Sequence, residues 1–321
     1  MSRMTRMMWR ALRPSPTGLA VGLLADRVLG DPRRFHPVAG MGQGAAALEA
    51  RLYADRRGAG VVQVAVCVGA AAGVGGLTAA VVSSHPGARI LVTAAATWAV
   101  CGGTTLAGVG EQMADALDAG DLDAGRALVP SLCGRDPQAL DAAGICRAAT
   151  ESIAENTADA TVGPLVWGAV AGLPGLLGYR MANTLDAMIG HHNRRYERFG
   201  WAAARFDDVL NLVPARLSGL LVVALGPDRR GALRAWRDDA AAHPSPNAGV
   251  VEASFAGALG LRLGGETVYP HRVEQRPVLG DGRPPGTADL RAAVALSRRV
   301  QLGALAVSAG VAVLLSRRSA G

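Results

Sequence analysis

The sequence contains no lysine: all 33 residues in its Lys and Arg count are arginine. A chain without lysine cannot form the Schiff base on which PLP enzymes depend. It also cannot supply the phosphate-binding lysine of a P-loop. Any phosphate must therefore be held by arginine, by backbone N–H groups or by a metal ion.

Charge and aromatic side chains are also scarce, at 18% and 4% of the residues, whereas 50% of the residues are hydrophobic. Sparse charge with abundant apolar residues excludes disorder for most of the chain. The four cysteines form no C-x-x-C pair, so the sequence gives little sign of a metal site or a disulfide built on cysteine. This composition favours one compact, largely helical membrane body.

Three uncharged runs have the length of a membrane crossing, which is about 20 residues. Val61–Val82 and Ile90–Gly110 are joined by a short link and predict a transmembrane hairpin, and Val300–Ser316 predicts a C-terminal span. Arg56 and Arg57 precede the first run and favour a cytoplasmic start.

Two further apolar runs are interrupted. Ala160–Tyr179 could span the membrane or re-enter on the same side. We favour re-entry, because a crossing would place the arginine-rich segment 181–208 outside. Val209–Gly226 contains Pro214 and Arg216 and is expected to be half-buried rather than an ordinary crossing.

The predicted fold class is all-α: a polytopic integral membrane helical protein with polar, motif-bearing loops and short or re-entrant helices. We expect a single membrane-embedded domain over residues 1–321. Its parts are a hairpin at about 61–110, a polar helical segment at about 111–150, a motif-bearing core at about 151–295 and a span at about 300–316. The apolar stretch Leu19–Leu29 is short and charged, so we expect no cleaved signal peptide.

Polar residues gather in five islands. The first, Asp26–Val38, has a non-helical path because of its glycine and prolines. It carries Asp31, Arg33, Arg34 and His36. It is either a polar loop at the membrane interface or an anion or metal site.

The second island places Glu151, Glu155 and Asp159 at helical spacing on one face. Carboxylates at this spacing repel one another, and no basic residue lies between them in the sequence. Something positive should therefore lie against this stripe, and Mg²⁺ is the natural candidate because it prefers carboxylate oxygens. A solvated acidic helix end is the alternative.

The third island contains Asn183 and Asp186, followed by the adjacent His191 and His192, whose spacing is poor for zinc. Arg194 and Arg195 follow them and suit phosphate or carboxylate contacts.

The fourth island brings Asp207 and Asp208 within one helical turn of Asn211 and is a second candidate set of oxygen ligands. Arg216 follows, and it either serves the site or forms an internal ion pair with one of these aspartates. The fifth island contains Ser245, Asn247 and Glu252. Its first two residues could cap a helix, and exposed N–H groups at a helix start favour phosphate.

These islands resemble the cobalamin-biosynthesis family called CobD or CbiB, the adenosylcobinamide-phosphate synthases. The matching pieces follow the order of the family and span Asp26 to about Ala295. They are DRVLGDPRRFHPV (26–38), ESIAENTADATVGP (151–164), YRMANTLDAMIGHHNRRY (179–196), ARFDDVLNLVPAR (204–216), SPNAGVVEASFAGALGLRLGG (245–265) and RPVLG (276–280). The chain departs from the family pattern at Val250 and Val251, where Trp-Pro is usual.

The resemblance implies ATP- and Mg²⁺-dependent formation of an amide between adenosylcobyric acid and (R)-1-amino-2-propanol or its O-phosphate. The islands supply carboxylates for metal and arginines for phosphate. The residues expected at the reacting groups are His36, as a candidate base for the amine, with Glu151, Glu155, Asn156, Asp186 and Asp208. The expected metal ligands are Glu151, Glu155, Asp159, Asp207 and Asp208. The expected substrate and phosphate contacts are Asp31, Arg33, Arg34, Asn183, Arg194, Arg205, Asn211, Arg216, Ser245, Asn247 and Glu252.

We expect the protein in the cell membrane with its active site facing the cytoplasm. The lipid bilayer and other cobalamin-biosynthesis enzymes are its expected partners, and nucleic acid is not. Two other classes fit parts of the pattern. Broken helices with polar residues at membrane depth also describe transporters, although no inverted repeat is visible. A non-catalytic scaffold or sensor is the second alternative, and the intact carboxylate stripe speaks against it.

Overall fold

The computed structural model describes residues 14–31, 36–191, 193–269 and 272–318. It is 77% helical, which confirms the all-α class. Five helical stretches are long and apolar enough to cross a membrane: Arg57–Val81, Pro86–Asp118, Ala142–Ile189, Trp201–Leu225 and Thr287–Arg317. The chain is therefore a polytopic helical membrane protein.

The chain divides into two compact units, each built from separate stretches of sequence. Unit 1 comprises Met1–Gly102, Gly163–Asn211 and Leu305–Gly321, and unit 2 comprises Gly103–Val162 and Leu212–Ala304. Each unit is described by itself below. The single domain expected from the sequence stays a prediction.

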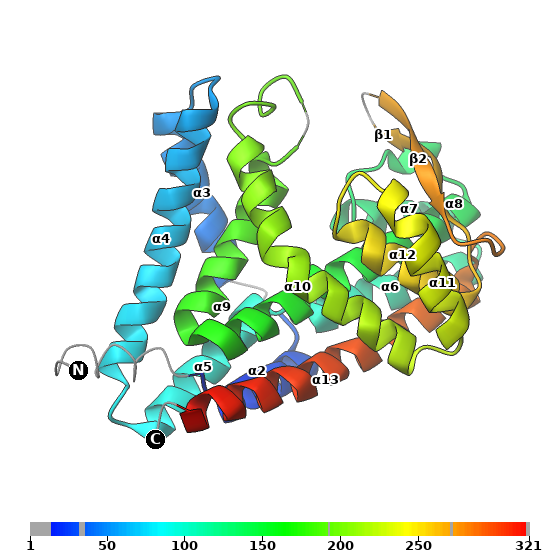
Figure 1. The fold of residues 1–321 in the computed structure, drawn as a ribbon. Helices are drawn as coiled ribbons and strands as arrows, with labels where there is room; N and C mark the ends of the chain where they lie inside the picture. The colour runs from blue at the N-terminus through cyan, green and yellow to red at the C-terminus, as the bar shows by residue number, and fades with distance from the viewer. Residues whose placement is uncertain (1–13, 32–35, 192, 270–271, 319–321) are drawn as a thin grey trace. The chain divides into compact units, whose positions relative to one another are not determined.

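Unit 1 is a helical layer in which α4 and α5 pack on α9 (Figure 1). Its helices are α2 (Pro16–Leu29), α3 (Pro37–Leu52), α4 (Arg57–Val81), α5 (Pro86–Val100), α9 (Gly163–Ile189) and the first part of α10 (Trp201–Leu225). The two runs expected to form the hairpin are helical, as α4 and α5, although α5 ends before Cys101 and the helical path restarts at Gly103. Both helices pack on α9, and the transmembrane hairpin itself stays a prediction.

The helix α9 is broken near its middle, where the sequence predicted an interrupted run. Gly172 has φ 62° and ψ −148°, a conformation open to glycine and strained for other residues, and Pro174 follows two residues later. The helix α4 packs closely on this break, since a Cβ at Gly75 would lie 2.7 Å from the carbonyl oxygen of Leu173. Whether the halves cross or re-enter the membrane stays a prediction.

Unit 2 is a group of helices with a two-stranded hairpin on its outside (Figure 1), which the sequence did not predict. Its helices are α6 (Gly103–Asp118), α7 (Leu122–Leu128), α8 (Ala142–Thr157), α11 (Arg229–Asp239), α12 (Ala248–Leu259) and the N-terminal part of α13 (Thr287–Arg318). The strands β1 (Leu263–Tyr269) and β2 (Arg272–Leu279) pair antiparallel and contact α12 (Figure 1). The hairpin contributes Leu263 and Leu279 to the core of this unit.

Two apolar runs differ in extent from the expectation. Residues 209–225 lie in α10, a continuous helix despite Pro214 and long enough to cross a membrane. Whether this run crosses the membrane or stays half-buried remains a prediction. The C-terminal span begins earlier than expected, at Thr287. The polar start of α13 is held to α6 because Arg291 pairs with Asp118 at 2.7 Å and Arg298 with Glu111 at 2.6 Å.

Candidate functional site

In unit 1, two of the predicted polar islands meet between α9 and α10. Asp207 is buried, and its Oδ2 accepts a hydrogen bond from Asn211 Nδ2 at 2.9 Å. Asn211 Oδ1 in turn accepts from the Tyr179 hydroxyl at 2.8 Å. Asn183 also hydrogen-bonds to Asp207, and Asp186 acts on it electrostatically. We call these five residues the aspartate cluster.

Helical spacing explains why the aspartate cluster forms. Asp207 and Asn211 are four residues apart on α10, so their side chains share a face. Tyr179, Asn183 and Asp186 lie four and three residues apart on α9 and form the facing stripe. The sequence identified four of these five residues as candidates, and the structure brings them together.

The donor set of the aspartate cluster suits a hard cation. Asp207 Oδ1 is buried and has no hydrogen-bond partner among the described residues. Mg²⁺ is commonly held by one or two carboxylates, with water and substrate phosphates completing its shell. Across the described ranges, no group of three or more His, Cys, Asp or Glu residues converges to hold a metal ion unaided.

Asp208 and Arg205 face each other rather than the aspartate cluster's buried centre. Arg205 Nη1 lies 3.2 Å from Asp208 Oδ2, one helical turn away, and the arginine side chain is largely exposed. The structure therefore pairs an expected metal ligand with an expected phosphate contact.

In unit 2, the predicted carboxylate stripe meets arginine. Glu151 on α8 is 2% exposed, and its Oε2 accepts a hydrogen bond from Arg135, which is also buried. Its Oε1 accepts from the backbone N–H of Gly264 on β1 at 2.7 Å. Arg276 on β2 approaches the same carboxylate, with Nη1 3.7 Å from Oε2. The expected positive partner is present, and it is a pair of guanidinium groups.

Arg276 also contacts a second buried carboxylate and a histidine. Its Nη2 lies 3.7 Å from Glu252 Oε1 and 2.6 Å from His243 Nε2. Glu252, on α12, is 1% exposed, and its Oε1 has no partner at hydrogen-bond distance among the described residues. We call Arg135, Glu151, His243, Glu252 and Arg276 the arginine–glutamate cluster.

Burial shifts the pKa values of two residues in the arginine–glutamate cluster, His243 and Glu252. Burial and the neighbouring Arg276 lower the pKa of His243 to about 4, so the imidazole is neutral at physiological pH. A guanidinium can only donate, so His243 Nε2 accepts from Arg276. Its Nδ1 faces the backbone of Ser245, 3.0 Å from the N–H nitrogen and 3.3 Å from the carbonyl oxygen. Burial, reinforced by the Glu151 carboxylate, raises the pKa of Glu252 well above its usual range.

The other residues expected on the carboxylate stripe follow Glu151 along the chain. Glu155, one turn beyond Glu151, is exposed to solvent but still interacts electrostatically with Arg276, Glu151 and Arg135. Asn156 turns back and donates to the Ser152 carbonyl oxygen at 2.9 Å. Asp159 lies in a π-helical turn, Ala158–Val162, which changes its angular position relative to a regular helix. The expected three-residue stripe therefore ends at Glu155.

The fifth island forms the start of α12. Ser245 Oγ accepts hydrogen bonds from the backbone N–H groups of Asn247 and Ala248, both at 3.2 Å. The Asn247 side chain makes no capping bond. Its Oδ1 instead accepts from Arg216 Nη1 at 2.6 Å. The structure thus gives Arg216 a neutral partner, and an ion pair between Arg216 and an aspartate stays a prediction.

The first island is described only in part, because Arg33 and Arg34 lie outside the described residues. His36 begins α3, where its Nδ1 accepts from the backbone N–H of Val38 at 3.2 Å. Its Nε2 is 4.0 Å from Asp31 Oδ2. The candidate base is thus also a helix cap.

Arg195 connects the third island to the end of α3 through Glu49 and Tyr53. Its Nη2 donates to the buried Glu49 at 3.0 Å, and its guanidinium stacks 4.3 Å above the centre of the Tyr53 ring. Arg194 and His191 are exposed, and the expectation for His192 lies outside the described residues.

Sequence reasoning missed three residues of the arginine–glutamate cluster: Arg135, His243 and Arg276. Arg276 opens the RPVLG piece, and His243 precedes the SPNAG piece, so both lay beside recognised motifs. Arg135 lies in a mixed polar stretch that carried no signal. The unbalanced carboxylates predicted a positive partner, and only the fold shows which one.

The helical membrane fold and the two buried polar clusters together define the class of protein. It is a polytopic membrane protein whose helices bury clusters of polar and charged side chains. A model of the CobD/CbiB protein family matches residues 19–297. A cobalamin biosynthesis protein CobD of Mycobacterium tuberculosis is 57% identical over 293 residues, covering 89% of this chain and 92% of that protein.

Two further relatives carry the same name. The protein of Chromobacterium violaceum is 42% identical, covering 92% of this chain and 96% of its own length. That of Rhodobacter capsulatus is 52% identical over 205 residues, covering 64% and 65%. No solved structure matches the chain.

The chain belongs to the CobD/CbiB family, and its process is cobalamin biosynthesis.

Proposed function

We propose that the protein joins adenosylcobyric acid to (R)-1-amino-2-propanol, or to its O-phosphate, by an amide bond in a reaction that uses ATP and Mg²⁺. The observation that carries this proposal is the pair of buried polar clusters, most of whose residues lie on the sequence pieces that resemble the family. One cluster is rich in acidic oxygen atoms and the other presents a guanidinium.

The chemistry explains why both kinds of group are needed. A carboxylate is a poor electrophile, so a phosphoryl group moved from ATP to the corrinoid carboxylate makes phosphate the leaving group and releases ADP. The amine then attacks the carbonyl carbon, the C–N bond forms as the C–O bond to phosphate breaks, and the nitrogen loses one proton. Positive groups must balance the phosphate charge throughout.

Asp207, with Asp186 and Asn183 beside it, would hold Mg²⁺, which neutralises phosphate charge when it is bound. Arg276 would bind an anionic group of the substrate, because its guanidinium is only partly buried, with 19% of its side chain exposed. Glu151 would position Arg276, since both its oxygen atoms are already engaged. His36 remains the proposed base for the amine, at the exposed start of α3.

The test uses the full chain in detergent or lipid with adenosylcobyric acid, aminopropanol phosphate, Mg²⁺ and ATP, with mass spectrometry for the amide. Product that depends on ATP and Mg²⁺ supports the proposal. Asp207→Asn should lower the rate at least 100-fold, and Asp123→Asn, at an exposed aspartate of α7, serves as its matched control.

Full activity of both Glu155→Gln and Asp208→Asn would remove those two residues from the metal ligands expected from the sequence. Product without ATP would refute the acyl-phosphate route. Corrinoid uptake into proteoliposomes without amide formation would favour a transporter, the class to which the break at Gly172 also points.

A further inference from the structure

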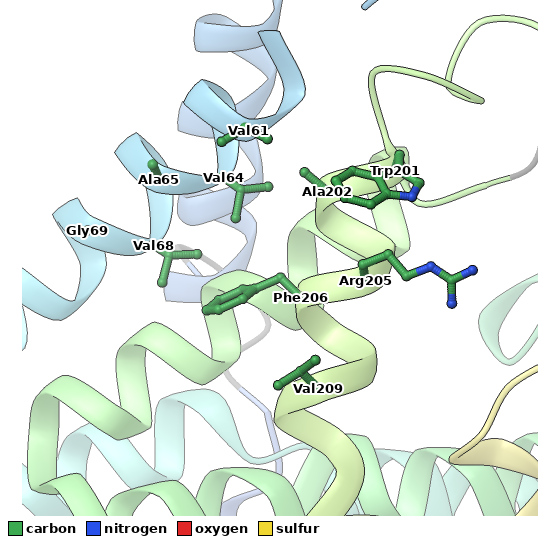
Figure 2. A pocket seen from close by; sticks show the side chains of 10 residues that line it. All are labelled: Val61, Val64, Ala65, Val68, Gly69, Trp201, Ala202, Arg205, Phe206 and Val209. Atoms are coloured by element: carbon green, nitrogen blue, oxygen red, sulfur yellow. The ribbon is translucent and has the colours of Figure 1, made fainter. Parts of the chain in front are cut away.

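A groove in unit 1 runs between α4 and the start of α10, apart from both polar clusters. Its volume is about 470 Å³. Val61, Val64 and Val68 line the α4 side, and Phe206 and Val209 line the other (Figure 2). The lining side chains are apolar except for Arg205, which points away from α4 in Figure 2.

The dimensions of the groove suit a hydrocarbon chain. From Val61 to Gly69 the helix rises about 12 Å, less than half of the roughly 30 Å hydrocarbon core of a bilayer. Phe206 is 38% exposed and Val209 60% exposed. Both α4 and α10 are among the helices that could cross a membrane, so this face would meet lipid.

One end of the groove is basic. Arg56, Arg57, Arg198 and Glu197 line a second hollow of about 460 Å³. The Arg57 guanidinium lies 5.0 Å from the centre of the Trp201 ring, which itself lines the apolar groove. The two hollows therefore meet at this cation–π pair.

Two arginines at this end of the groove are available to bind an anion. Arg198 forms an ion pair with Asp55, with 3.8 Å between Nη1 and Oδ2. Arg56 and Arg57 form no ion pair with any described residue. Both α4 and α10 begin here, so their unpaired N–H groups add partial positive charge. Tryptophan and arginine beside an apolar stretch are typical of the level of lipid headgroups.

We propose that this groove binds one anionic phospholipid, with an acyl chain along α4 and α10 and the phosphate at Arg56 and Arg57. The charge complementarity selects an anionic headgroup, and the apolar groove selects a lipid over a soluble phosphate. The site is independent of the amide-forming reaction.

The test measures retained lipid by native mass spectrometry of the full chain in detergent, with phosphatidylglycerol or phosphatidylcholine added. The wild-type chain should retain one phosphatidylglycerol. Arg56→Gln with Arg57→Gln should weaken its binding about 30-fold, or about five-fold for each arginine. Arg229→Gln with Arg230→Gln is the matched control, since these exposed arginines also begin a helix, α11.

A second variant blocks the apolar part. A Cβ at Gly69 meets no atom within 4 Å, so Gly69→Leu should fill the groove without disturbing the fold. Gly73→Leu, at an equally open position outside the groove, is its control. Equal retention of both lipids, competition by inorganic phosphate alone, or unchanged binding by Gly69→Leu would each overturn the proposal.

Discussion

At the scale of single residues, the ion pair of Arg135 and Glu151 shows how the buried interior of unit 2 tolerates charge. Both side chains are nearly inaccessible, at 5% and 2% exposure. Burying two charges costs several kcal/mol each unless they are paired and hydrogen-bonded. The Gly264 N–H completes the hydrogen bonding of the Glu151 carboxylate, so that carboxylate is satisfied only when β1 is in place, whereas Arg135 Nη1 has no hydrogen-bond partner among the described residues.

Removing one partner of this pair should be far worse than removing both. Arg135→Leu leaves the buried Glu151 carboxylate with only the more distant Arg276 as a cation, 3.7 Å away, and should destabilise the protein by about 3 kcal/mol. Arg135→Leu with Glu151→Gln should recover part of that loss. Unfolding in detergent monitored by circular dichroism measures both, with Arg237→Leu at an exposed pair as control. Equal losses of unfolding free energy in the single and the double variant would contradict the cost assigned to the unpaired buried charge.

His243 predicts a pH dependence of stability with a definite sign. Its pKa is lowered from 6.5 to about 4, so between these values the unfolded chain binds a proton that the folded chain does not. Stability should therefore fall as the pH falls from 6.5 to 4.

The variant His243→Asn should be less sensitive to pH in that window, as measured by the melting temperature in detergent. Glu252 acts with the opposite sign, because its raised pKa makes the folded chain bind the extra proton. The difference between wild type and variant isolates the histidine. His85→Asn, at an exposed turn, is the control and should leave the pH profile unchanged.

At the scale of elements, the break in α9 is a built feature rather than a local irregularity. Gly172→Ala forces a side chain into its unusual backbone conformation and should cost about 1–3 kcal/mol. Gly178→Ala on the same helix meets only ordinary contacts, the nearest at 3.5 Å, and should be nearly neutral. Melting temperatures compare the two, and equal effects would contradict a special role for Gly172.

Helices and their interruptions could largely be read from the sequence, because apolar runs and prolines act locally. The interruption predicted within Ala160–Tyr179 is present at Gly172. The helix α10 was misjudged because Pro214 and Arg216 argue for a break when tertiary contacts are unknown. Arg216 is accommodated by Asn247, 31 residues along the chain, and no local pattern reports such a partner.

The same dependence on tertiary contacts explains which residues of the candidate site could be predicted from the sequence. Asp207, Asn211, Asn183 and Asp186 were found because helical spacing alone groups them into two short stripes. Tyr179 was missed as a member because its hydroxyl matters only once α9 and α10 meet. The β-hairpin that delivers Arg276 escaped notice because a two-stranded element inside a helical chain has a weak periodic signal.

At the scale of the whole molecule, the arginines predict how unit 1 is oriented in the membrane. Arg56 and Arg57 lie where α4 begins, and the turn at its other end, Ser83–His85, carries no arginine. Basic residues are favoured on the cytoplasmic side. We therefore expect the turn after α4 to face outward.

Single cysteines test this orientation. Ser84→Cys should react with a membrane-impermeant maleimide in intact cells, whereas Asn193→Cys should react only after lysis. The unaltered chain is the control, since three of its four cysteines are buried. The reverse labelling pattern would invert the proposed topology and place the basic end of the lipid groove outside.

The position of Arg276 between two glutamates has a consequence for ligand binding. An anion that binds the Arg276 guanidinium competes with the carboxylates of Glu151 and Glu252, each of which already lies 3.7 Å from it. Glu252, buried and deprived of its cation, would then bind a proton more tightly. Anion binding and proton uptake are thus thermodynamically linked, and the affinity of the cluster for an anion should rise as the solution becomes more acidic.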